Sequence, residues 1–470
     1  MKSPPSPAAT AKRPRFSPFV LLLALFLLLF SFLYGEDLKE LLARRRAQSP
    51  LLQFNSGNSA ASAGEAIVLP PPAKTTTTAR SRRWRGRLPF VANGDGEDNE
   101  CDVFSGTWVP AGGGGEASSP AATYYGESEC PYIPAQLTCE AHGRPETAYR
   151  RWRWKPHGCD LPAFDAAAFL AALRGRRVLF VGDSLGRGQF TSLVCLLAAA
   201  VPDPAARRIE MAPDQQRSVF TAAEYNVTVE FYWAPFLLRS NADDAVVHRI
   251  SDRMVRRGSI EHHGRHWVGA DVIVFNTYLW WCTGLRFKIL DGPSFGDNGS
   301  GGGNVSETET AKTTWVSTEE AYGMAFKDML RWTREHMDFN KTRVFFTSMS
   351  PTHGKSQDWG GEEGGNCYGE TEMITDPDYW GSDSRRSVMR TIREILDGDE
   401  FADVPITFLN VTQLSLYRKD AHTSIYKKQW TPLTPEQLAD PKSYADCVHW
   451  CLPGLQDTWN ELLYTKLFYP

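Results

Sequence analysis

The sequence predicts an α/β fold, in which a parallel sheet carries helices on both faces beside a smaller region held by disulfides. Three observations support this prediction. Short apolar segments of strand length alternate with segments of helical periodicity, which is typical of βαβ units. The predicted strands are apolar almost throughout, as strands buried on both faces are. A stretch that is rich in cysteine and poor in helical patterns precedes the alternation.

The first 98 residues differ in composition from the rest of the chain. Residues 1–15 are basic and proline-rich, and residues 16–34 carry no charge over a length close to the roughly 20 residues that span a bilayer. We therefore expect a cytosolic tail, a transmembrane signal anchor at 16–34 and a lumenal body. A cleaved signal peptide is the alternative, but no small-residue cleavage site follows Tyr34. Residues 35–98 are polar and proline-rich, and we expect a disordered stem there.

The body, expected at 99–470, carries the signals of an oxidising compartment. The chain has nine cysteines, and Cys101, Cys130, Cys139 and Cys159 lie in the loop-rich stretch at its start. Disulfides are the expected state of such cysteines, although their spacing leaves the pairing open. Five sequons predict N-glycosylation, at Asn226, Asn298, Asn304, Asn340 and Asn410.

Strands and helices then alternate along the body. Strands are expected at 177–182, 271–276, 343–347 and 406–411, and helices at 185–200, 318–336 and 387–396. The glycine-rich residues 296–310 are expected to form a mobile surface loop. Ligands bind at the carboxyl ends of the strands in such sheets, and Ser184, Asn276 and Ser348 each follow a strand end.

Ser184 lies in a strand-to-helix turn, RRVLFVGDSLGRGQ at 176–189, and is the candidate nucleophile. A serine hydroxyl needs a base within hydrogen-bond reach and a group that orients that base. Asp446 and His449 can supply both, because a three-residue offset places two side chains together on one helical turn or tight loop. The alternative is that Ser184 only caps the helix. The triad predicts a serine-dependent acyl-transfer enzyme.

An acyl-transfer intermediate carries an oxyanion, which needs donors placed in advance. The backbone amide of Ser184, the side chain of Asn276 and the charge of Arg187 are candidates, and Gly182 and Asp183 adjoin them as possible acetyl-binding residues. Asn276 could instead be an ordinary strand-end residue and Arg187 an exposed helical arginine.

Trp280 and Trp281 are candidates for an acceptor site, because aromatic faces stack on sugar rings, although core packing is equally open to them.

We expect neither a metal nor a nucleic-acid partner. His262, His263 and His266 lie in a polar stretch without an accompanying carboxylate motif, and we interpret them as solvated surface. A metal site formed by His449 with Cys447 and Cys451 lacks a second CxxC pair. The net charge of −4 and the pI near 6.2 give no basic footprint for nucleic acid.

The order GDS, then Asn, then DxxH resembles the SGNH or GDSL esterase superfamily. The body as a whole resembles the plant trichome-birefringence-like family of polysaccharide O-acetyltransferases, and its xylan-acetylating subgroup in particular. The blocks that carry this resemblance are CDVFSGTWV at 101–109, RWRWKP at 151–156, VEFYWAPFLL at 229–238, FNTYLWW at 275–281, VFFTSMSPTH at 344–353, GNCYGET at 365–371, LNVTQLSLYRKDAH at 409–422 and DCVHWCLPGLQDTWNELL at 446–463.

The resemblance implies a Golgi type II membrane protein with a lumenal catalytic body. Its fold would be a Rossmann-like, flavodoxin-type lobe with a smaller lobe beside it, and a cleft between them would receive the polysaccharide. Ser184, His449 and Asp446 would form the triad. The implied disulfides are Cys101–Cys159, Cys130–Cys195, Cys139–Cys451 and Cys367–Cys447, with Cys282 free.

The implied reaction transfers an acetyl group to O2 or O3 of a xylosyl residue through an acetyl-serine. It requires an acetyl donor, whose identity no motif indicates, and no other cofactor. Three alternatives remain open at this point: an esterase that uses water as the acceptor, a transferase that acts on another hemicellulose such as mannan, and a non-catalytic wall-polymer binder.

Overall fold

The computed structural model describes residues 102–111, 124–248, 252–292 and 312–469. The predictions for the tail, the membrane anchor, the stem and the loop at 296–310 lie outside these residues, as do Cys101, Asn298 and Asn304. None of the helices within the described ranges is long and apolar enough to cross a membrane. Of the remaining sequon asparagines, Asn226 and Asn340 are exposed and Asn410 is half-buried.

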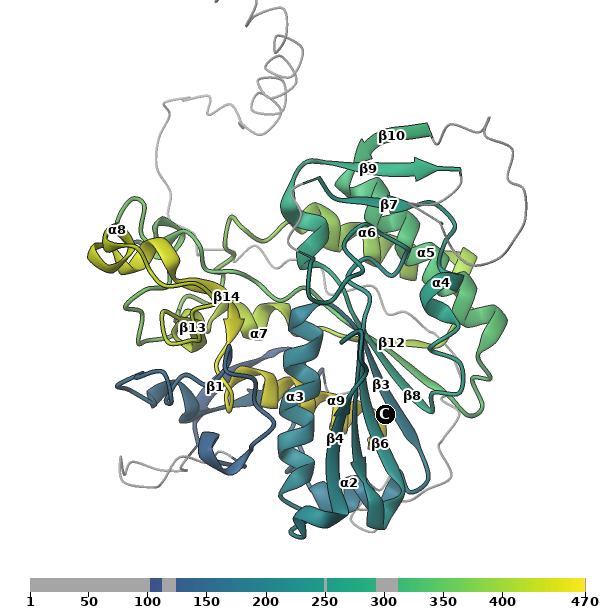
Figure 1. Ribbon diagram of the computed structural model, residues 1–470, viewed down its shortest axis with the longest axis horizontal. Coiled ribbons are helices and arrows are strands. Elements are labelled where there is room, and N and C mark those ends of the chain that lie inside the picture. Colours follow the sequence, from purple (N-terminus) through teal and green to yellow (C-terminus); the bar gives the residue numbers. More distant parts are fainter. Residues whose placement is uncertain (1–101, 112–123, 249–251, 293–311, 470) are drawn as a thin grey trace, which may run out of the picture. The chain divides into compact units, whose positions relative to one another are not determined.

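A seven-stranded sheet forms the centre of the described body (Figure 1). Its order is β12-β11-β8-β3-β6-β5-β4. The five strands from β12 to β6 run parallel, whereas β5 and β4 pair antiparallel at one edge. The bounds are β3 Arg177–Gly182, β4 Arg207–Met211, β5 Arg217–Ala222, β6 Val227–Trp233, β8 Val272–Asn276, β11 Arg343–Thr347 and β12 Ile406–Leu409.

The parallel strands stand in a doubly wound order. In chain order β3, β6, β8, β11 and β12 are the first to fifth strands, so the sheet has the order 2-1-3-4-5 from β6 to β12. This is the flavodoxin-like arrangement, in which the direction of winding reverses beside the first strand. The sheet is mixed rather than purely parallel. Burial alternates along β5, and β4 is exposed along most of its length, so the two strands form an antiparallel edge that the search for apolar strands missed.

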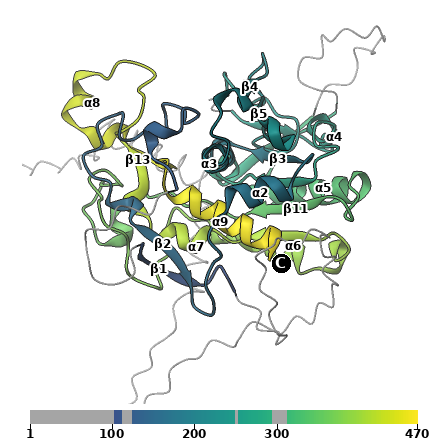
Figure 2. The same ribbon diagram turned by 90° about the horizontal axis from the view of Figure 1, so that it is seen from below.

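Helices cover both faces of this sheet (Figure 2). Phe180 of β3 contacts Phe190 of α3, whereas Phe346 of β11 contacts Phe326 of α5. The register places these two phenylalanines on opposite faces of the sheet. Phe180 pairs with Val274 of β8 and Phe346 pairs with Phe275, and successive residues of a strand point to opposite faces. Helices α3 and α9 pack together on one face, and α5 and α6 on the other.

The helices have the following bounds: α2 Ala166–Ala172, α3 Ser184–Ala198, α4 Glu261–Gly264, α5 Thr318–His336, α6 Arg386–Leu396, α7 Thr412–Leu416, α8 Pro435–Ala439 and α9 Leu455–Phe468. The predicted strands and helices are confirmed to within a few residues at their ends. Helix α9 and strand β6 were not predicted from the sequence, although both overlap blocks that carried the family resemblance.

Three small sheets complete the fold. Strands β1 (Gly106–Pro110) and β2 (Trp152–Pro156) form an antiparallel pair, and β13 (His422–Ser424) and β14 (Asp446–Trp450) form another. A third sheet has the order β10-β9-β7, with β7 Met254–Arg256, β9 Arg286–Asp291 and β10 Lys312–Ser317.

Disulfides join the loop-rich stretch to the rest of the body. The described residues contain Cys130–Cys195, Cys139–Cys451 and Cys367–Cys447, which are three of the four pairs that the resemblance implied, and Cys282 is a free thiol. Cys159 is also disulfide-bonded. The expected partner of Cys159, Cys101, lies outside the described residues.

Candidate active site

Ser184 is the first residue of α3, at the carboxyl end of the central strand β3. The turn before it is tight: Gly182 has a φ of 155°, and a Cβ there would lie 1.8 Å from the carbonyl oxygen of Asn276. Only glycine fits this approach. Asp183 then caps α3, because its carboxylate accepts a 2.9 Å hydrogen bond from the amide of Leu185. The capping alternative for Ser184 is therefore wrong, and its hydroxyl is left for another partner.

That partner is His449. Nε2 of His449 lies 2.8 Å from the hydroxyl oxygen of Ser184, and Nδ1 lies 2.9 Å from a carboxylate oxygen of Asp446. A carboxylate can only accept, so Nδ1 carries the hydrogen and Nε2 of the neutral ring accepts from the serine hydroxyl. The geometry is that of a Ser-His-Asp triad. Ser184 is half-buried, and the side chains of His449 and Asp446 are 15% and 14% exposed.

Asp446 and His449 meet in a way that the sequence analysis did not predict. Residues 446–450 form strand β14 and not a helical turn. An extended strand would send side chains at i and i+3 to opposite sides. Here one carboxylate oxygen of Asp446 accepts from the amides of Val448 and His449, at 3.1 and 3.0 Å, and this side-chain turn brings the other oxygen to the imidazole. The pairing of β13 with β14 is irregular at the same point.

The Asp446 carboxyl is ionised. Burial on its own would raise its pKa, but the charge of His449 and the hydrogen bonds from His449 and Val448 outweigh burial and hold the pKa well below the usual range of an aspartate. Asp446 can therefore orient the imidazole and stabilise an imidazolium without taking the proton itself.

Two disulfides flank the base. Cys447 bonds to Cys367 and Cys451 bonds to Cys139, so both ends of β14 are covalently attached to distant parts of the chain. The ring of His449 is also contacted by a residue that the sequence analysis missed: Nε2 of the buried Gln136 lies 3.2 Å from Nδ1 of His449. Gln136 stands three residues before Cys139, and that proximity to a disulfide was the only signal that could have indicated it.

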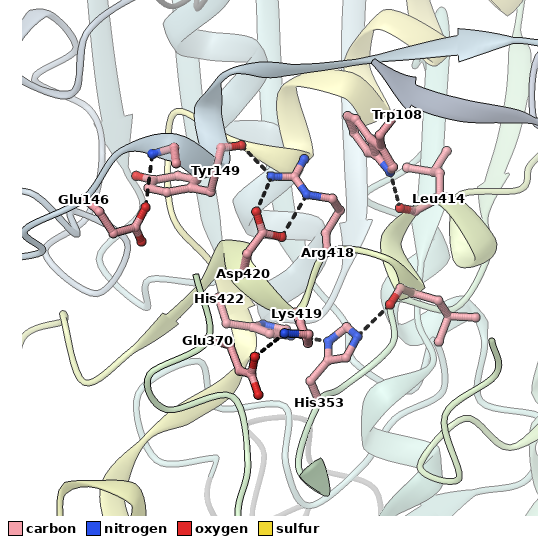
Figure 3. A network of polar contacts seen from close by, with 12 residues as sticks. Trp108, Glu146, Tyr149, His353, Glu370, Leu414, Arg418, Lys419, Asp420 and His422 are labelled. Carbon is pink, nitrogen blue, oxygen red and sulfur yellow. Dashed lines mark hydrogen bonds and ion pairs between the residues drawn. The ribbon is translucent and has the colours of Figure 1, made fainter. Parts of the chain in front are cut away.

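A buried polar network supports β13, the strand that pairs with β14 (Figure 3). Arg418 and Asp420, whose side chains are 2% and 1% exposed, form a two-pronged ion pair, and Arg418 also donates to the carbonyl of Tyr149. Arg144 donates to the carbonyls of Asp420 and His422, at 2.6 and 2.8 Å. Removing one partner of such a buried pair leaves an uncompensated charge, so the network strongly specifies this conformation.

A pair of buried histidines continues the network toward the base (Figure 3). Nδ1 of His353 lies 2.7 Å from Nε2 of His422, and the outer nitrogens of the two rings lie 2.8 Å from the carbonyl of Leu416 and 3.1 Å from the carbonyl of His449. The ring of His422 stacks on Trp450 with centroids 3.8 Å apart. Burial lowers the pKa of His353 to about 4, and it also lowers that of His422, so both rings are neutral at neutral pH.

The predicted oxyanion residues gather at the start of α3. Asn276 ends β8, and its Cβ would contact a side chain at Gly186 of the first turn of α3. Its amide nitrogen is buried and has no hydrogen-bond partner among the described residues. A buried donor without a partner costs free energy unless a ligand uses it. With the amides at the helix N-terminus, this donor can stabilise negative charge that develops beside Ser184.

Arg187 and Asp183 place a positive and a negative charge at the start of α3. Arg187 is half-buried and has no ion-pair partner in the part of the chain that the structure describes; its guanidinium lies 6.0 Å from the centroid of the Trp233 ring. Burial lowers the pKa of Arg187, and the charge of Asp183 partly offsets this. Burial raises the pKa of Asp183 to about 6, against the opposing effects of the Leu185 amide and His449.

Neither predicted acceptor-binding tryptophan offers a face to a sugar, which corrects that prediction. Trp281 is fully buried. Its indole N–H donates a hydrogen bond to the hydroxyl of Thr277, and its ring packs against Phe236. Trp280 is 7% exposed, its ring is covered by the guanidinium of Arg253 at 4.0 Å, and it packs edge-to-face with Trp233. The 3₁₀ turn Leu279–Thr283 directs both rings into the core, which was the alternative considered for them.

The interpretation of the histidine cluster as solvated surface holds for His266, which is exposed, but is wrong for His263. His263 is completely buried, and it lies with His262 beside the carboxylate of Asp243. These three side chains are the ones in the described residues that could together hold a metal ion.

The arrangement around Ser184 can therefore carry out nucleophilic acyl chemistry. The hydroxyl has a base within reach, and the base has an ionised carboxylate behind it. The side-chain amide of Asn276, which has no hydrogen-bond partner among the described residues, lies at the start of the same helix.

Comparisons with known proteins agree with this chemistry. Residues 161–466 match the family model PC-Esterase, described as the GDSL/SGNH-like acyl-esterase family found in Pmr5 and Cas1p, and residues 99–160 match the PMR5 N-terminal domain. The chain is 74% identical to probable xylan O-acetyltransferase 9 of Oryza sativa subsp. japonica, over 100% of both chains. It is 55% identical to probable xylan O-acetyltransferase 10 of the same organism, over 79% of this chain and 78% of the relative. It is 42% identical to protein trichome birefringence-like 35 of Arabidopsis thaliana, over 78% and 76%.

Proposed function

We propose that this chain, which belongs to the PC-Esterase family of GDSL/SGNH-like proteins, is a xylan O-acetyltransferase that carries the acetyl group on Ser184. The observation that supports this most strongly is the continuous contact from the hydroxyl of Ser184 through His449 to Asp446, at 2.8 and 2.9 Å. The names of the relatives supply the substrate class: two rice relatives, identical at 74% and 55% of positions, are named as probable xylan O-acetyltransferases.

In the first half of the proposed reaction, the acetyl group moves to the enzyme. The hydroxyl oxygen of Ser184 attacks the carbonyl carbon of the acetyl donor while Nε2 of His449 takes the hydroxyl proton. The carbonyl oxygen becomes an oxyanion, which the amide of Ser184 and the side-chain amide of Asn276 stabilise. The tetrahedral intermediate then collapses, the donor's leaving group departs with the proton from His449, and acetyl-Ser184 remains.

In the second half, a xylosyl hydroxyl takes the place of the serine hydroxyl. His449 accepts the proton of the O2 or O3 hydroxyl, whose oxygen attacks the acetyl carbon of acetyl-Ser184. A second oxyanion forms at the same donors and collapses, and the proton on His449 returns to the oxygen of Ser184. Asp446 keeps the ring in one tautomer through both halves.

We also propose that the chain is a single-pass type II membrane protein of the Golgi apparatus. The uncharged segment 16–34 behind a basic tail supports the anchor, and the disulfides and exposed sequon asparagines support a lumenal body. Fractionated plant membranes provide the test. The protein should resist extraction at alkaline pH, and glycosidase treatment should shift its mass. Release as a soluble protein would contradict the anchor.

The test of function is acetylation of xylohexaose by the purified full chain with an acetyl donor, followed by intact-mass and NMR analysis. We expect acetyl groups on O2 or O3 with the wild type and none with Ser184→Ala. Ser443→Ala is the matched control, because that hydroxyl lies on an exposed turn and donates only to the carbonyl of Asp440. Loss of acetyl groups from pre-acetylated xylan without transfer would instead identify an esterase. Transfer to mannan but not to xylan would change the proposed acceptor.

A further inference from the structure

A second cluster of side chains lies away from Ser184, between α4 and the segment that follows β6. It consists of Asp243, His262 and His263, whose ligand atoms all lie within 4.8 Å of one another. Nε2 of His263 lies 3.3 Å, and Nε2 of His262 3.8 Å, from the same carboxylate oxygen of Asp243. Ligands that are about 2.0–2.1 Å from a tetrahedral Zn²⁺ lie about 3.3 Å apart. The contact of His263 with Asp243 has this spacing, and His262 must move inward to complete the set.

The partners of His263 leave one nitrogen facing the cluster. The ring is completely buried. Nδ1 of His263 lies 3.2 Å from the hydroxyl of Tyr232, which can accept from it. Nε2, in contrast, is buried and faces the carboxylate of Asp243, whose oxygen lies 3.3 Å away. A metal-bound histidine typically donates its other ring nitrogen to a neighbour in this way, which fixes the tautomer that binds.

The carboxylate of Asp243 is held in place by its own segment. The hydroxyl of Ser240 donates to one oxygen at 2.6 Å, and the amide of Ser240 donates to the other at 3.0 Å. This second oxygen is the one that both histidines approach, and it retains a lone pair for a further bond. The side chain of Asp243 is 13% exposed and that of His262 31% exposed, so an ion and a water molecule can reach the cluster from the side of His262.

We propose that Asp243, His262 and His263 bind one zinc ion. Two imidazole nitrogens and one carboxylate oxygen are a donor set that suits Zn²⁺, with water in the fourth position. A hard cation such as Ca²⁺ would need six to eight oxygen ligands, which this cluster lacks. The site is separate from the triad, and the proposal does not depend on the proposed acetyl transfer.

The position of the site indicates what the ion does. It joins the segment after β6 to α4, and the same segment carries His248, whose ring contacts Trp233 at 4.8 Å between centroids and Trp280 at 5.4 Å. The guanidinium of Arg187, in the first turn of the helix that begins with Ser184, lies over Trp233. The bound ion would therefore fix a wall of aromatic rings next to the start of α3.

Metal analysis of the untagged full chain tests this proposal. The protein is stripped with a chelator, titrated with Zn²⁺, Mn²⁺ or Ca²⁺, and followed by calorimetry and thermal unfolding. We expect one equivalent of Zn²⁺ to bind and to raise Tm, with little response to Ca²⁺. Co²⁺ bound in its place should give the intense visible absorption of a four-coordinate ion.

Two variants and a control make the test specific. His262→Gln changes a partly exposed side chain, and Asp243→Asn keeps the size of the carboxylate; each should weaken Zn²⁺ binding by about 100-fold or more. His266→Gln is the control, because His266 stacks on Tyr232 but does not belong to the cluster, and it should bind Zn²⁺ like the wild type. Circular dichroism checks that each variant is folded. Failure of the wild type to bind stoichiometric Zn²⁺, or unchanged binding by folded His262→Gln, would overturn the proposal.

Discussion

Ser184 and His449 are held by two regions of different construction. Residues 178–182 of the strand before Ser184 are apolar and buried, and the strand lies between two parallel neighbours in the middle of the sheet. The strand that carries His449 belongs to a two-stranded ladder, flanked by two disulfides and supported by the buried ion pair Arg418–Asp420. Packing places the nucleophile, whereas cross-links and charges place the base. The two halves of one site should therefore respond differently to substitution.

Among substitutions that keep the nucleophile, the largest effect is expected for Asp446→Asn. The asparagine can still accept from the amides of Val448 and His449, so β14 should keep its shape, but the ring of His449 loses its ionised partner. We expect the acetyl-transfer rate to fall about 10⁴-fold, as in other triads with this substitution, with a small change in Tm. Steady-state assays on xylohexaose measure it. Asp376→Asn, at an exposed side-chain turn, should have no effect. A loss of less than tenfold would mean that Asp446 only shapes the strand.

Removing disulfides one at a time compares the two regions directly. Replacing Cys367 and Cys447 with serine frees the strand of His449, and this should lower stability by up to about 4 kcal/mol and reduce kcat of the folded protein. Replacing Cys130 and Cys195 frees α3 near its far end, so it should lower stability with kcat largely kept. Denaturant titration and assays at low temperature separate the two effects. Equal losses of kcat in the two double variants would contradict the distinction between the regions.

Gly182→Ala should disturb the packed region. An added Cβ would lie 1.8 Å from the carbonyl oxygen of Asn276, so β3 and β8 must separate at the end that carries the site. We expect a loss of about 3 kcal/mol of stability, together with lost activity. Denaturant unfolding measures it. Gly269→Ala is the matched control: Gly269 also has a positive φ, but nothing lies within 4 Å of its added Cβ, so the cost there should be smaller. Equal costs would show that the backbone angle, and not the contact, matters.

The smallest effect concerns pH. The pKa of Asp183 is raised to about 6 by burial, so folding disfavours its carboxylate, and its contribution to stability declines as pH rises from about 4 through 6. Asp183→Asn keeps a good helix cap and removes this decline. Relative to the wild type, the variant should gain about 2 kcal/mol between pH 4 and pH 7.5. Asp165→Asn, at the exposed cap of α2, should show no such gain. If the difference in stability between the variant and the wild type stayed constant across this pH range, burial would not raise the pKa of Asp183.

The sequence predicted the packed region far better than the cross-linked one. Four apolar strands were placed within a few residues because hydrophobic runs report burial directly. The residues of the triad were also identified from sequence, and a helical turn or tight loop was expected to bring Asp446 to His449. The structure instead uses a side-chain turn within a strand, which leaves no periodic signal. Gln136, Arg144 and the His353–His422 pair act through contacts between distant segments, and no local pattern encodes such contacts.

The number of ring hydrogens on His353 and His422 limits how many hydrogen bonds the pair can make. Three contacts run in series from the carbonyl of Leu416 through both rings to the carbonyl of His449, yet two neutral rings supply only two hydrogens. At most two of the three contacts, at 2.8, 2.7 and 3.1 Å, can then be hydrogen bonds at the same time, and the tautomers of the two rings decide which contact lacks a hydrogen. A third proton would complete the chain. The tautomer of a buried, non-catalytic pair thereby sets how firmly the backbone of the catalytic base is held.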